Sequence, residues 1–349
     1  MYGYDLFHKE QGYWFVKSVK PTRAPTLADV ARAAGLSPMT VSRALNTPQL
    51  VREKTVEKVK QAVQATGYIP NALAGGLASR RSRLIAVVVP QINNNMFVDT
   101  IQSISDTLAA RGYHMLLCVA GYDQQTEAEL VATLLSRRPD GMVLTGIHHS
   151  STLKKVVLNA AIPVVEIWDL TPTPLDMLVG FSHEKVGIAI GEYLYQKGYR
   201  QPGLLWAGDA RAAQRKQGIC ETLAKHAITE VTEISVPLPA SMAGGRNGLT
   251  QLLKKGEFDV VICSSDTLAQ GVIMEAENQG LSVPDDLAVI GFGDLDFAAC
   301  NRPAITTVKI DRLEMGKRAA TLLADKIENQ GDTDVIVDIG FQLIERVSA

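Results

Sequence analysis

The sequence has no long apolar run and few cysteines, and both shortages narrow the class of protein. No stretch of about 18 apolar residues occurs, so we predict no membrane-spanning helix. The first 20 residues contain Asp5, Lys9 and Glu10 where an export signal needs an apolar segment, which favours a cytoplasmic protein. Neither a disulfide framework nor a metal site is expected, because no C-x-x-C pair is formed by the four cysteines, Cys118, Cys220, Cys263 and Cys300.

Signatures of common enzymes are also missing. The chain contains no G-x-S-x-G, no H-E-x-x-H and no P-loop, and Gly291-Phe292-Gly293 lacks the third glycine of a dinucleotide-binding loop. We therefore predict that the protein is not an enzyme and needs no cofactor. These absences leave open a sugar-binding or metabolic protein, which is the alternative to the function that the following segments indicate.

The chain of 349 residues, 46% of them hydrophobic, is long enough for several cores, and its charge is distributed unevenly. The net charge is −2, but residues 22–83 contain ten Lys or Arg against three acidic residues and carry +7. Residues 1–21 carry +1, which leaves −10 on residues 84–349. A small basic segment beside a large acidic one is typical of a protein in which only the first meets a polyanion. A basic segment can also be a plain solvated face, so the periodicity has to decide.

The basic segment shows the signals of three short helices. Thr26 and Asp29 form a capping-box pattern before apolar residues at helical spacing, and Gly35 stands where a left-handed cap ends a helix. Ser37-Pro38 then starts a second helix with a cap hydroxyl and a proline at the first helical position. Two helices joined by a tight turn and backed by a third, from about Arg52 to Ala65, predict a helix-turn-helix.

The order of these residues resembles the head of the lactose-repressor (LacI) family. The resemblance implies that seven side chains of the second helix and its cap contact DNA: some hold phosphates (Ser37, Thr40, Ser42 and Asn46) and others face base edges (Pro38, Met39 and Arg43). It adds three further DNA-binding candidates, Thr26, Tyr68 and Asn71. The matching segments are Thr26-Leu27-x-Asp29-Val30-Ala31, Ala34-Gly35-Leu36-Ser37, Thr40-Val41-Ser42-Arg43 and Gly67-Tyr68-Ile69-Pro70-Asn71.

The chemistry of the second helix supports part of this division. Its N-terminal end is the end that enters a major groove in helix-turn-helix proteins. Arg43 can form two hydrogen bonds with guanine, a contact worth about 1 to 3 kcal/mol of discrimination. Pro38 and Met39 offer only apolar surface, which suits a thymine methyl group. The alternative for Met39 is a partly buried filler.

Residues 69–83 are expected to form a hinge. Asn71 to Ser79 includes Gly75 and Gly76, each of which costs about 1 kcal/mol relative to alanine in a helix, so the segment should be disordered alone. In the family this segment folds when it pairs with its dimer mate on DNA, and a leucine from each chain wedges into the minor groove. Leu77 matches that leucine. The alternative is a plain flexible linker.

From Leu84 the pattern changes to short apolar runs that alternate with amphipathic helices. Such runs are typical of parallel sheets covered on both faces, and they occur at 84–90, 115–119, 141–145 and 163–167, then again at 203–206, 260–263 and 287–291. The predicted fold class is α/β, with an all-α helix-turn-helix head (22–68), a hinge helix, and a two-lobed sensor of doubly wound parallel sheets (84–349). The resemblance implies a sensor like the periplasmic binding proteins.

The resemblance covers nearly all of residues 26–344, and within the family it is to the gluconate-repressor subgroup, through segments such as Gly121-Tyr122 and Val179-Gly180-Phe181. Ligands bind outside the carboxyl ends of the strands in such sheets. Arg215 matches the family arginine whose planar fork holds ligand hydroxyls or a carboxylate. The full set of ligand-binding candidates is Asn94, Phe97, Thr145, His149, Glu166, Asp169, Arg215, Ser265, Asp266, Phe292 and Asp294.

Several candidates also fit a structural role. The alternatives are ordinary strand-end surface residues for Glu166 and Asp169, a loop or interface residue for His149, an interlobe salt bridge for Arg215 and a helix cap for Asp266.

Two polar positions differ from the family pattern and bear on the ligand. Ser265 stands where an asparagine is usual, and Gly293 stands where an aspartate often binds sugar hydroxyls. One carboxylate fewer leaves Arg215 with less local competition, so we expect an anionic ligand, a sugar acid such as gluconate. A neutral sugar and a nucleoside or purine are the alternatives.

We expect a homodimer, or a higher oligomer, that presents two heads to a pseudo-palindromic operator in double-stranded DNA and acts as a repressor. Residues 1–21 match nothing in the family, and their aromatic residues crowd a stretch too short to bury them. We interpret this extension as disordered or as the result of a start codon set too early, since translation from the Val19 codon would give ordinary family length.

Overall fold

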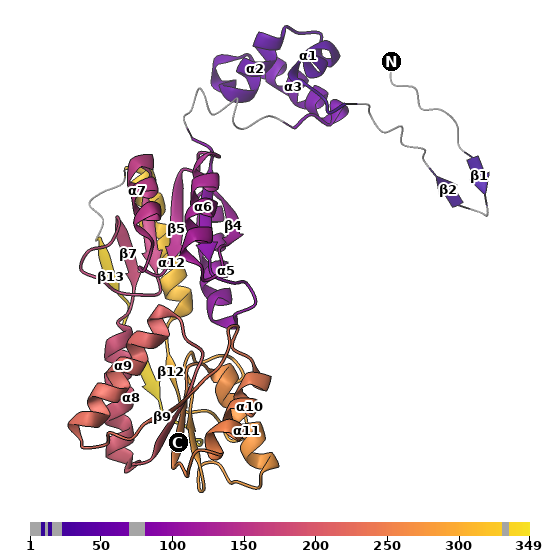
Figure 1. Cartoon of the computed structure of the whole chain (residues 1–349). Coiled ribbons are helices and arrows are strands. Elements are labelled where there is room, and N and C mark those ends of the chain that lie inside the picture. The colour runs from indigo at the N-terminus through magenta and orange to yellow at the C-terminus, as the bar shows by residue number, and fades with distance from the viewer. Residues whose placement is uncertain (1–7, 11–12, 16–22, 70–80, 330–334) are drawn as a thin grey trace. The chain divides into compact units, whose positions relative to one another are not determined.

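The computed structural model describes residues 8–10, 13–15, 23–69, 81–329 and 335–349, and the chain forms two compact units, Met1–Ser82 and Arg83–Ala349 (Figure 1). Most of the expected hinge, including Asn71 and Leu77, lies outside the described residues. Within the expected extension, strand β1 (His8–Glu10) pairs antiparallel with β2 (Tyr13–Phe15).

Three helices form the head, and their ends are capped by the residues that the sequence indicates. The backbone N–H of Thr26 donates to the Asp29 carboxylate at 2.9 Å, and Gly35 adopts a left-handed conformation with φ of 60°. The Ser37 hydroxyl accepts from the N–H of Thr40 at 3.2 Å. The elements are α1 (Leu27–Ala34), α2 (Pro38–Asn46), a 3-10 turn (Pro48–Leu50) and α3 (Glu53–Thr66).

A small apolar core holds the three helices together. Val30, Val41 and Val59 contribute one fully buried side chain from each helix. Helix α3 begins less securely than the other two, because Arg52 at its N-cap position makes no side-chain cap bond. The buried side chains of α2 fix the orientation of this helix and leave its polar face outward.

The first lobe of the second unit contains a six-stranded parallel sheet in the order β13-β7-β6-β5-β3-β4. Helices α5 and α12 pack together on one face, and α6 and α7 cover the other (Figure 1). The elements are β3 (Leu84–Val89), α5 (Asn95–Ala110), β4 (His114–Val119), α6 (Gln124–Leu135), β5 (Gly141–Thr145), α7 (Ser151–Ala160), β6 (Val164–Ile167), β7 (Met177–Gly180), α12 (Arg312–Glu328) and β13 (Ile336–Asp338).

The second lobe contains a four-stranded parallel sheet in the order β11-β10-β8-β9, with α8 and α9 on one face and α10 and α11 on the other. An antiparallel pair, β12 and β14, completes it. The elements are α8 (His183–Lys197), β8 (Pro202–Trp206), α9 (Ala210–Lys225), β9 (Thr232–Ser235), α10 (Met242–Leu253), β10 (Val260–Cys263), α11 (Asp266–Asn278), β11 (Ala288–Ile290), β12 (Thr307–Lys309) and β14 (Gln342–Ile344). This two-lobed α/β architecture confirms the predicted fold class.

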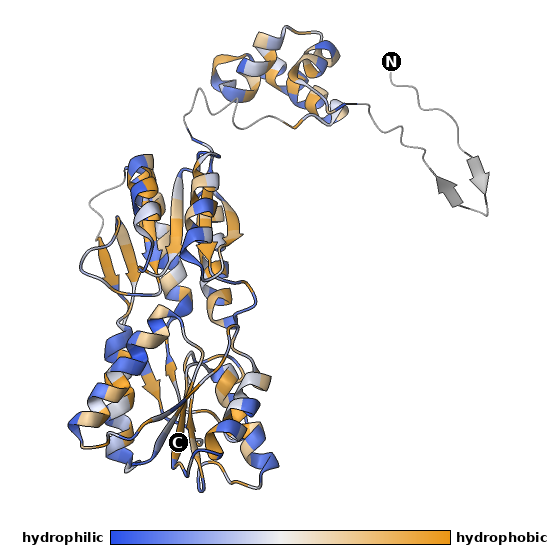
Figure 2. Cartoon of the chain, in the orientation of Figure 1, coloured by the Kyte–Doolittle hydropathy of each residue, from blue (hydrophilic) through white to orange (hydrophobic). Residues whose placement is uncertain are grey.

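Burial on both faces explains why the strands are apolar along their whole length. In β3, Ile85 and Val87 face the layer of α5 and α12, whereas Ala86 and Val88 face α6 and α7. Figure 2 shows the same apolar strands in both lobes, with polar residues on the outer helix surfaces.

In the second unit, five short strands, β7, β9, β12, β13 and β14, were not predicted. Each has only three or four residues, and periodicity cannot distinguish so short a run from a loop. Asn94 and Asp123 cap helices α5 and α6 through side-chain oxygens, which accept from backbone N–H groups of the first turn.

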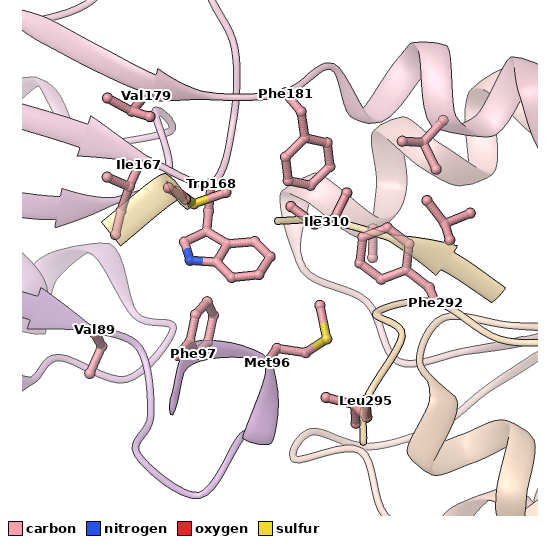
Figure 3. Close-up of a cluster of buried hydrophobic side chains, with 14 of the residues drawn as sticks. Val89, Met96, Phe97, Ile167, Trp168, Val179, Phe181, Phe292, Leu295 and Ile310 are labelled. Atoms are coloured by element: carbon pink, nitrogen blue, oxygen red, sulfur yellow. The ribbon is translucent and has the colours of Figure 1, made fainter. Parts of the chain in front are cut away.

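A cluster of apolar side chains joins the two lobes (Figure 3). The ring centroids of Phe97 and Trp168, both in the first lobe, lie 5.3 Å apart in an edge-to-face arrangement. Figure 3 shows the Met96 thioether between these rings and the region of Phe292 in the second lobe. A Cβ atom at Gly293 would lie 2.3 Å from the Met96 sulfur, so glycine is required for the close approach.

Asp266 is buried in the second lobe and joins α11 to the strands beside it. Its carboxylate accepts from the Thr307 hydroxyl at 2.6 Å and from the N–H of Leu295 at 2.8 Å. The helix cap proposed for this residue is instead Ser265, whose hydroxyl accepts from the N–H of Leu268. Burial raises the pKa of Asp266 to about 6.

Asp266→Asn should change how stability depends on pH. Because the folded pKa of Asp266 is raised above its unfolded value of 3.8, its contribution is complete below that value and is lost as the pH rises through about 6. The free energy of unfolding of the wild type, relative to Asp266→Asn, should therefore fall by about 2 kcal/mol between pH 4 and pH 8, at 1.36 kcal/mol per pKa unit. Urea unfolding at both pH values measures this, and Asp285→Asn controls for the loss of one exposed negative charge. Equal pH dependence of the wild type and Asp266→Asn would contradict the prediction.

Gly293→Ala should destabilise the second unit through the Met96 contact and through the backbone. Gly293 has φ of 129°, where a side chain costs about 1 to 3 kcal/mol, and the added methyl group meets the Met96 sulfur. Thermal unfolding of Gly293→Ala, Met96→Ala and the double variant should show that the double variant loses less than the sum of the singles. The prediction is contradicted if the losses of the two single variants are fully additive in the double variant. It is also contradicted if Gly293→Ala lowers the unfolding midpoint no more than the exposed control Gly256→Ala does.

Candidate functional sites

The outer face of α2 exposes both the polar and the apolar side chains that the sequence predicts to face DNA. Met39 is 72% exposed, which rules out its alternative role as a buried filler. Arg43 is exposed, and within the described residues its guanidinium has no ion-pair partner. Two internal bonds orient neighbouring polar groups: Ser37 with Thr40 at 2.9 Å, and Asn46 with Ser42 at 3.2 Å.

The other DNA-binding candidates of the head have structural contacts of their own. Thr26 is exposed, and its hydroxyl donates to Asp29 at 2.7 Å. Tyr68 is half-buried against the apolar core of the head. Exposed basic side chains on α3, Lys54, Lys58 and Lys60, add positive charge to this unit.

Two pockets lie at the carboxyl ends of the first-lobe strands. The first, here called the strand-end pocket, has a volume of 230 Å³ and is lined by Thr145 and His149 together with the loop before α9. The second, here called the cleft pocket, has a volume of 160 Å³ and is lined from both lobes, by Asn94, Phe97, Trp168, His183, Asp209, Arg211, Arg215, Ser264, Ser265 and Phe292 among others.

Thr145 and His149, the two predicted residues of the strand-end pocket, are bonded to neighbouring groups. The Thr145 hydroxyl donates to the carbonyl of Val88 at 2.9 Å. The two ring nitrogens of His149 lie 3.1 Å from the Glu127 carboxylate and 3.0 Å from the carbonyl of Gly146. Asp209 and Arg211 line this pocket as well as the cleft pocket, so the two pockets meet at the start of α9.

The four expected ligand-binding carboxylates line neither pocket, and their role in ligand binding stays a prediction. Glu166 accepts from the N–H of Leu175 at 2.6 Å, and burial raises its pKa. Asp169 accepts from the N–H of Leu170 at 2.8 Å, and burial raises its pKa as well. Asp294 pairs with Arg346 at 2.6 Å. Together with Asp266, these carboxylates hold loops and strands in place, which strand-end position alone could not reveal.

Arg215 is the central charged group of the cleft pocket. Its Nη1 donates to Nδ1 of His183 at 3.0 Å, its Nη2 donates to the carbonyl of Ser264 at 3.2 Å, and its guanidinium carbon lies 3.9 Å from the Phe292 ring centroid. Burial lowers the pKa of Arg215 to about 10, so the group remains cationic at neutral pH. The side chain is 5% exposed, and the salt bridge weighed for it is not formed within the described residues.

His183 is neutral and has a defined tautomer. Its Nδ1 accepts from Arg215, so its Nε2 carries the proton and donates to the carbonyl of Trp168 at 2.8 Å. Burial and the nearby Arg215 charge hold the pKa of His183 well below its usual range. The hydrogen-bond partners of Arg215 are thus both neutral, and its charge has no counter-ion in direct contact.

Tight packing of α8 against α9 fixes the relative position of His183 and Arg215. A Cβ atom at Gly187 would lie 2.1 Å from the carbonyl oxygen of Arg215, and one at Gly218 would lie 2.6 Å from that of Glu184. The helix backbones therefore touch at the level of His183 and Arg215.

Three buried donors of the cleft pocket have no partner: Nε of Arg215, Nη1 of Arg211 and Nε1 of Trp168. A buried donor left unpaired costs about 1 to 3 kcal/mol, so these atoms favour a ligand rich in acceptors. Sequence reasoning missed Arg211, Trp168 and His183. The four-residue spacing of Arg211 and Arg215 was the available signal, because it places both on one face of a helix.

Within the part of the chain that the structure describes, no group of three or more His, Cys, Asp or Glu residues could hold a metal ion. Among the same residues, none of the helices combines the length and the apolar character needed to cross a membrane.

Comparison with known proteins gives matches to both units. Residues 26–71 match the family model of bacterial regulatory proteins, lacI family, and residues 82–346 match that of periplasmic binding proteins and sugar binding domain of LacI family. The chain is 35% identical to the HTH-type transcriptional regulator GntR of Pseudomonas aeruginosa, covering 95% of this chain and 98% of that protein. It is 29% identical to the regulator IdnR of Escherichia coli, covering 91% and 96%.

Solved structures agree with these matches. A LacI family transcriptional regulator from Silicibacter pomeroyi superposes with a TM-score of 0.88 at 29% identity, covering 93% of this chain and 99% of that one. The lac repressor dimer bound to operator and the anti-inducer ONPF gives 0.78 at 26% identity, covering 93% and 99%. The chain therefore belongs to the LacI family, whose members are DNA-binding transcriptional regulators and not enzymes.

Proposed function

We propose that the protein is a cytoplasmic repressor that binds a pseudo-palindromic operator as a dimer and is controlled by a sugar acid such as gluconate. The observation that carries the choice of ligand is the buried guanidinium of Arg215, which donates only to neutral groups. A buried cation without a counter-ion favours an anion over a neutral sugar. Similar proteins named GntR and IdnR agree with the gluconate-repressor resemblance of the sequence.

In this proposal the head (22–68) reads the operator through α2. Its exposed N-terminal end lies in the major groove, where Arg43 contacts guanine and Met39 contacts a thymine methyl group. The hydroxyl and amide groups of α2 and its cap hold phosphates, with Thr26 and Tyr68 beside them. The hinge (69–83) contributes Asn71 and Leu77, and the sensor (84–349) binds the ligand.

The exposed edge of the first-lobe sheet supports the dimer. Strand β4 ends the sheet, and its side chains Leu116, Leu117 and Val119 are 37%, 37% and 48% exposed. Val98, near the start of α5, is also 48% exposed. An edge strand with apolar residues exposed on both faces is an aggregation risk unless another surface covers it. A second copy of this chain covers it in the proposal, which brings two heads to one operator.

Ligand binding acts through the contacts between the lobes. Helix α9 of the second lobe carries Gln214, whose amide nitrogen lies 2.8 Å from Nε2 of His148 and 3.3 Å from the Asp169 carboxylate of the first lobe. A ligand in the cleft that prefers one arrangement of the lobes shifts the population toward it. A ligand that prefers the DNA-released arrangement is an inducer, and one that prefers the other is a co-repressor.

Arg215→Gln should abolish the ligand response, because glutamine keeps a donor for His183 but removes the charge. We expect gluconate to raise the thermal unfolding midpoint of the wild type and not that of Arg215→Gln, while Arg215→Lys retains part of the shift. Operator binding without ligand serves as the check that the chain is folded. A shift produced by neutral sugars and not by any sugar acid would refute the sugar-acid assignment.

Arg43→Ala should weaken operator binding and relax its sequence preference, at about 1 to 3 kcal/mol for the lost guanine contact. Lys54→Ala is the matched control on the same unit, and it should lower affinity similarly for all duplexes and flatten the dependence on salt. Gel shifts with operator and scrambled duplexes at two salt concentrations separate these effects. If Arg43→Ala weakened both duplexes equally, base reading by Arg43 would be excluded.

A further inference from the structure

Arg211 is a second arginine in the cleft pocket, and hydrogen bonds to Asp209 hold its side chain in position. The Nε and Nη2 atoms of Arg211 donate to the same Asp209 oxygen at 3.3 and 2.7 Å. Asp209 is itself fixed, because its other oxygen caps α9 by accepting from the N–H of Ala212 at 2.8 Å. The guanidinium carbon of Arg211 lies 5.5 Å from the Phe97 ring centroid.

This arrangement uses only one edge of the Arg211 fork. Its Nη1 is buried and has no hydrogen-bond partner. The whole residue is 9% exposed and lines the cleft pocket. A residue needed only to pair with Asp209 gains nothing from burying its remaining donor, because an unpaired buried donor is destabilising. The free donor therefore points to an acceptor that arrives with the ligand.

The charges of the cleft lining limit what that acceptor can be. The described lining contains two guanidinium groups, on Arg211 and Arg215, and one carboxylate, on Asp209. The neighbouring Arg211 is the main group that offsets burial and holds the pKa of Asp209 at about 2, so this carboxylate is ionised. With His183 neutral, the lining carries one net positive charge, which a single negative charge on the ligand balances.

We propose that Arg211 is a specificity-determining residue that binds the carboxylate of the ligand, and that the set Asp209, Arg211 and Arg215 selects singly charged sugar acids over their phosphate esters. This rests on the proposed function, since it refines the ligand of the same pocket. The hydroxyl-bearing part of the ligand then meets the polar side chains of the lining, such as Asn94 and Ser265. A phosphate ester would bring additional negative charge into a site that has no cation left to balance it.

Isothermal titration calorimetry of the full chain tests this with three probes: gluconate, gluconate 6-phosphate and the uncharged polyol glucitol. The wild type should bind gluconate at least about tenfold more tightly than its phosphate ester. Arg211→Gln should weaken gluconate binding by about 10- to 100-fold, the value of a lost charged hydrogen bond, and should change glucitol binding less than about twofold. Arg137→Gln removes an exposed guanidinium outside the cleft and should leave all three affinities unchanged.

Asp209→Asn is the complementary variant. Asparagine still caps a helix, but the lining gains one net positive charge, so the preference for gluconate over its phosphate ester should shrink or reverse. The thermal unfolding midpoint without ligand shows whether each variant is folded. If Arg211→Gln is not folded, Arg211→Lys replaces it, because lysine keeps the charge but lacks the guanidinium fork.

The outcomes distinguish this inference from the proposed function. If Arg211→Gln binds gluconate as the wild type does while Arg215→Gln does not bind it, the role of Arg211 is overturned and the sugar-acid regulator stands. If Asp209→Asn leaves the discrimination against the phosphate ester intact, selection by this charge set is overturned. If the wild type binds glucitol or another neutral sugar and no sugar acid, both proposals fall.

Discussion

The guanidinium of Arg215 is enclosed by the second lobe, and the groups that hold it are neutral. A buried charge is ordinarily compensated by a carboxylate from the same chain, because its transfer from water costs several kcal/mol. Here Asp209, the carboxylate with the largest electrostatic effect on Arg215, is bonded to Arg211 instead. The cleft is therefore electrostatically incomplete on its own, and an anion that completes it contributes binding free energy that can act on the position of the lobes.

The departures from the family pattern around the cleft become intelligible in these terms. Gly293 stands where the family pattern has an aspartate, and an added Cβ atom there would meet the Met96 sulfur of the opposite lobe. The contact between lobes at this point is consequently apolar, as the neighbouring Phe97 and Trp168 rings are. The buried guanidinium groups of the cleft lie instead on α9, where Arg211 and Arg215 are one turn apart.

The sequence predicted the parts of the fold that depend on local signals. Helix caps at Ser37 and Gly35 and the long buried strands follow from hydrogen-bond chemistry and apolar periodicity, and the structure has them where they were expected. Short strands such as β9 and β13 were missed, because their formation depends on the strand beside them rather than on their own residues.

The ligand-binding candidates were harder to predict, because strand-end position does not determine what a side chain contacts. Arg215 and Ser265 do line the cleft pocket, whereas Glu166 and Asp294 are turned into local bonds that only the folded chain reveals. Arg211 was missed although its spacing from Arg215 was visible. Its free donor becomes evident only once Asp209 is seen to engage the other edge of the fork.

The backbone contact between α8 and α9 at Gly187 and Gly218 makes this part of the lobe an unyielding frame. Side chains that project from these helices into the cleft can be exchanged without disturbing the helix contact, whereas a Cβ atom added at either glycine would push the helices apart. Anyone who wishes to retune this regulator as a biosensor for a new metabolite should therefore randomise the projecting cleft residues and leave the helix crossing untouched.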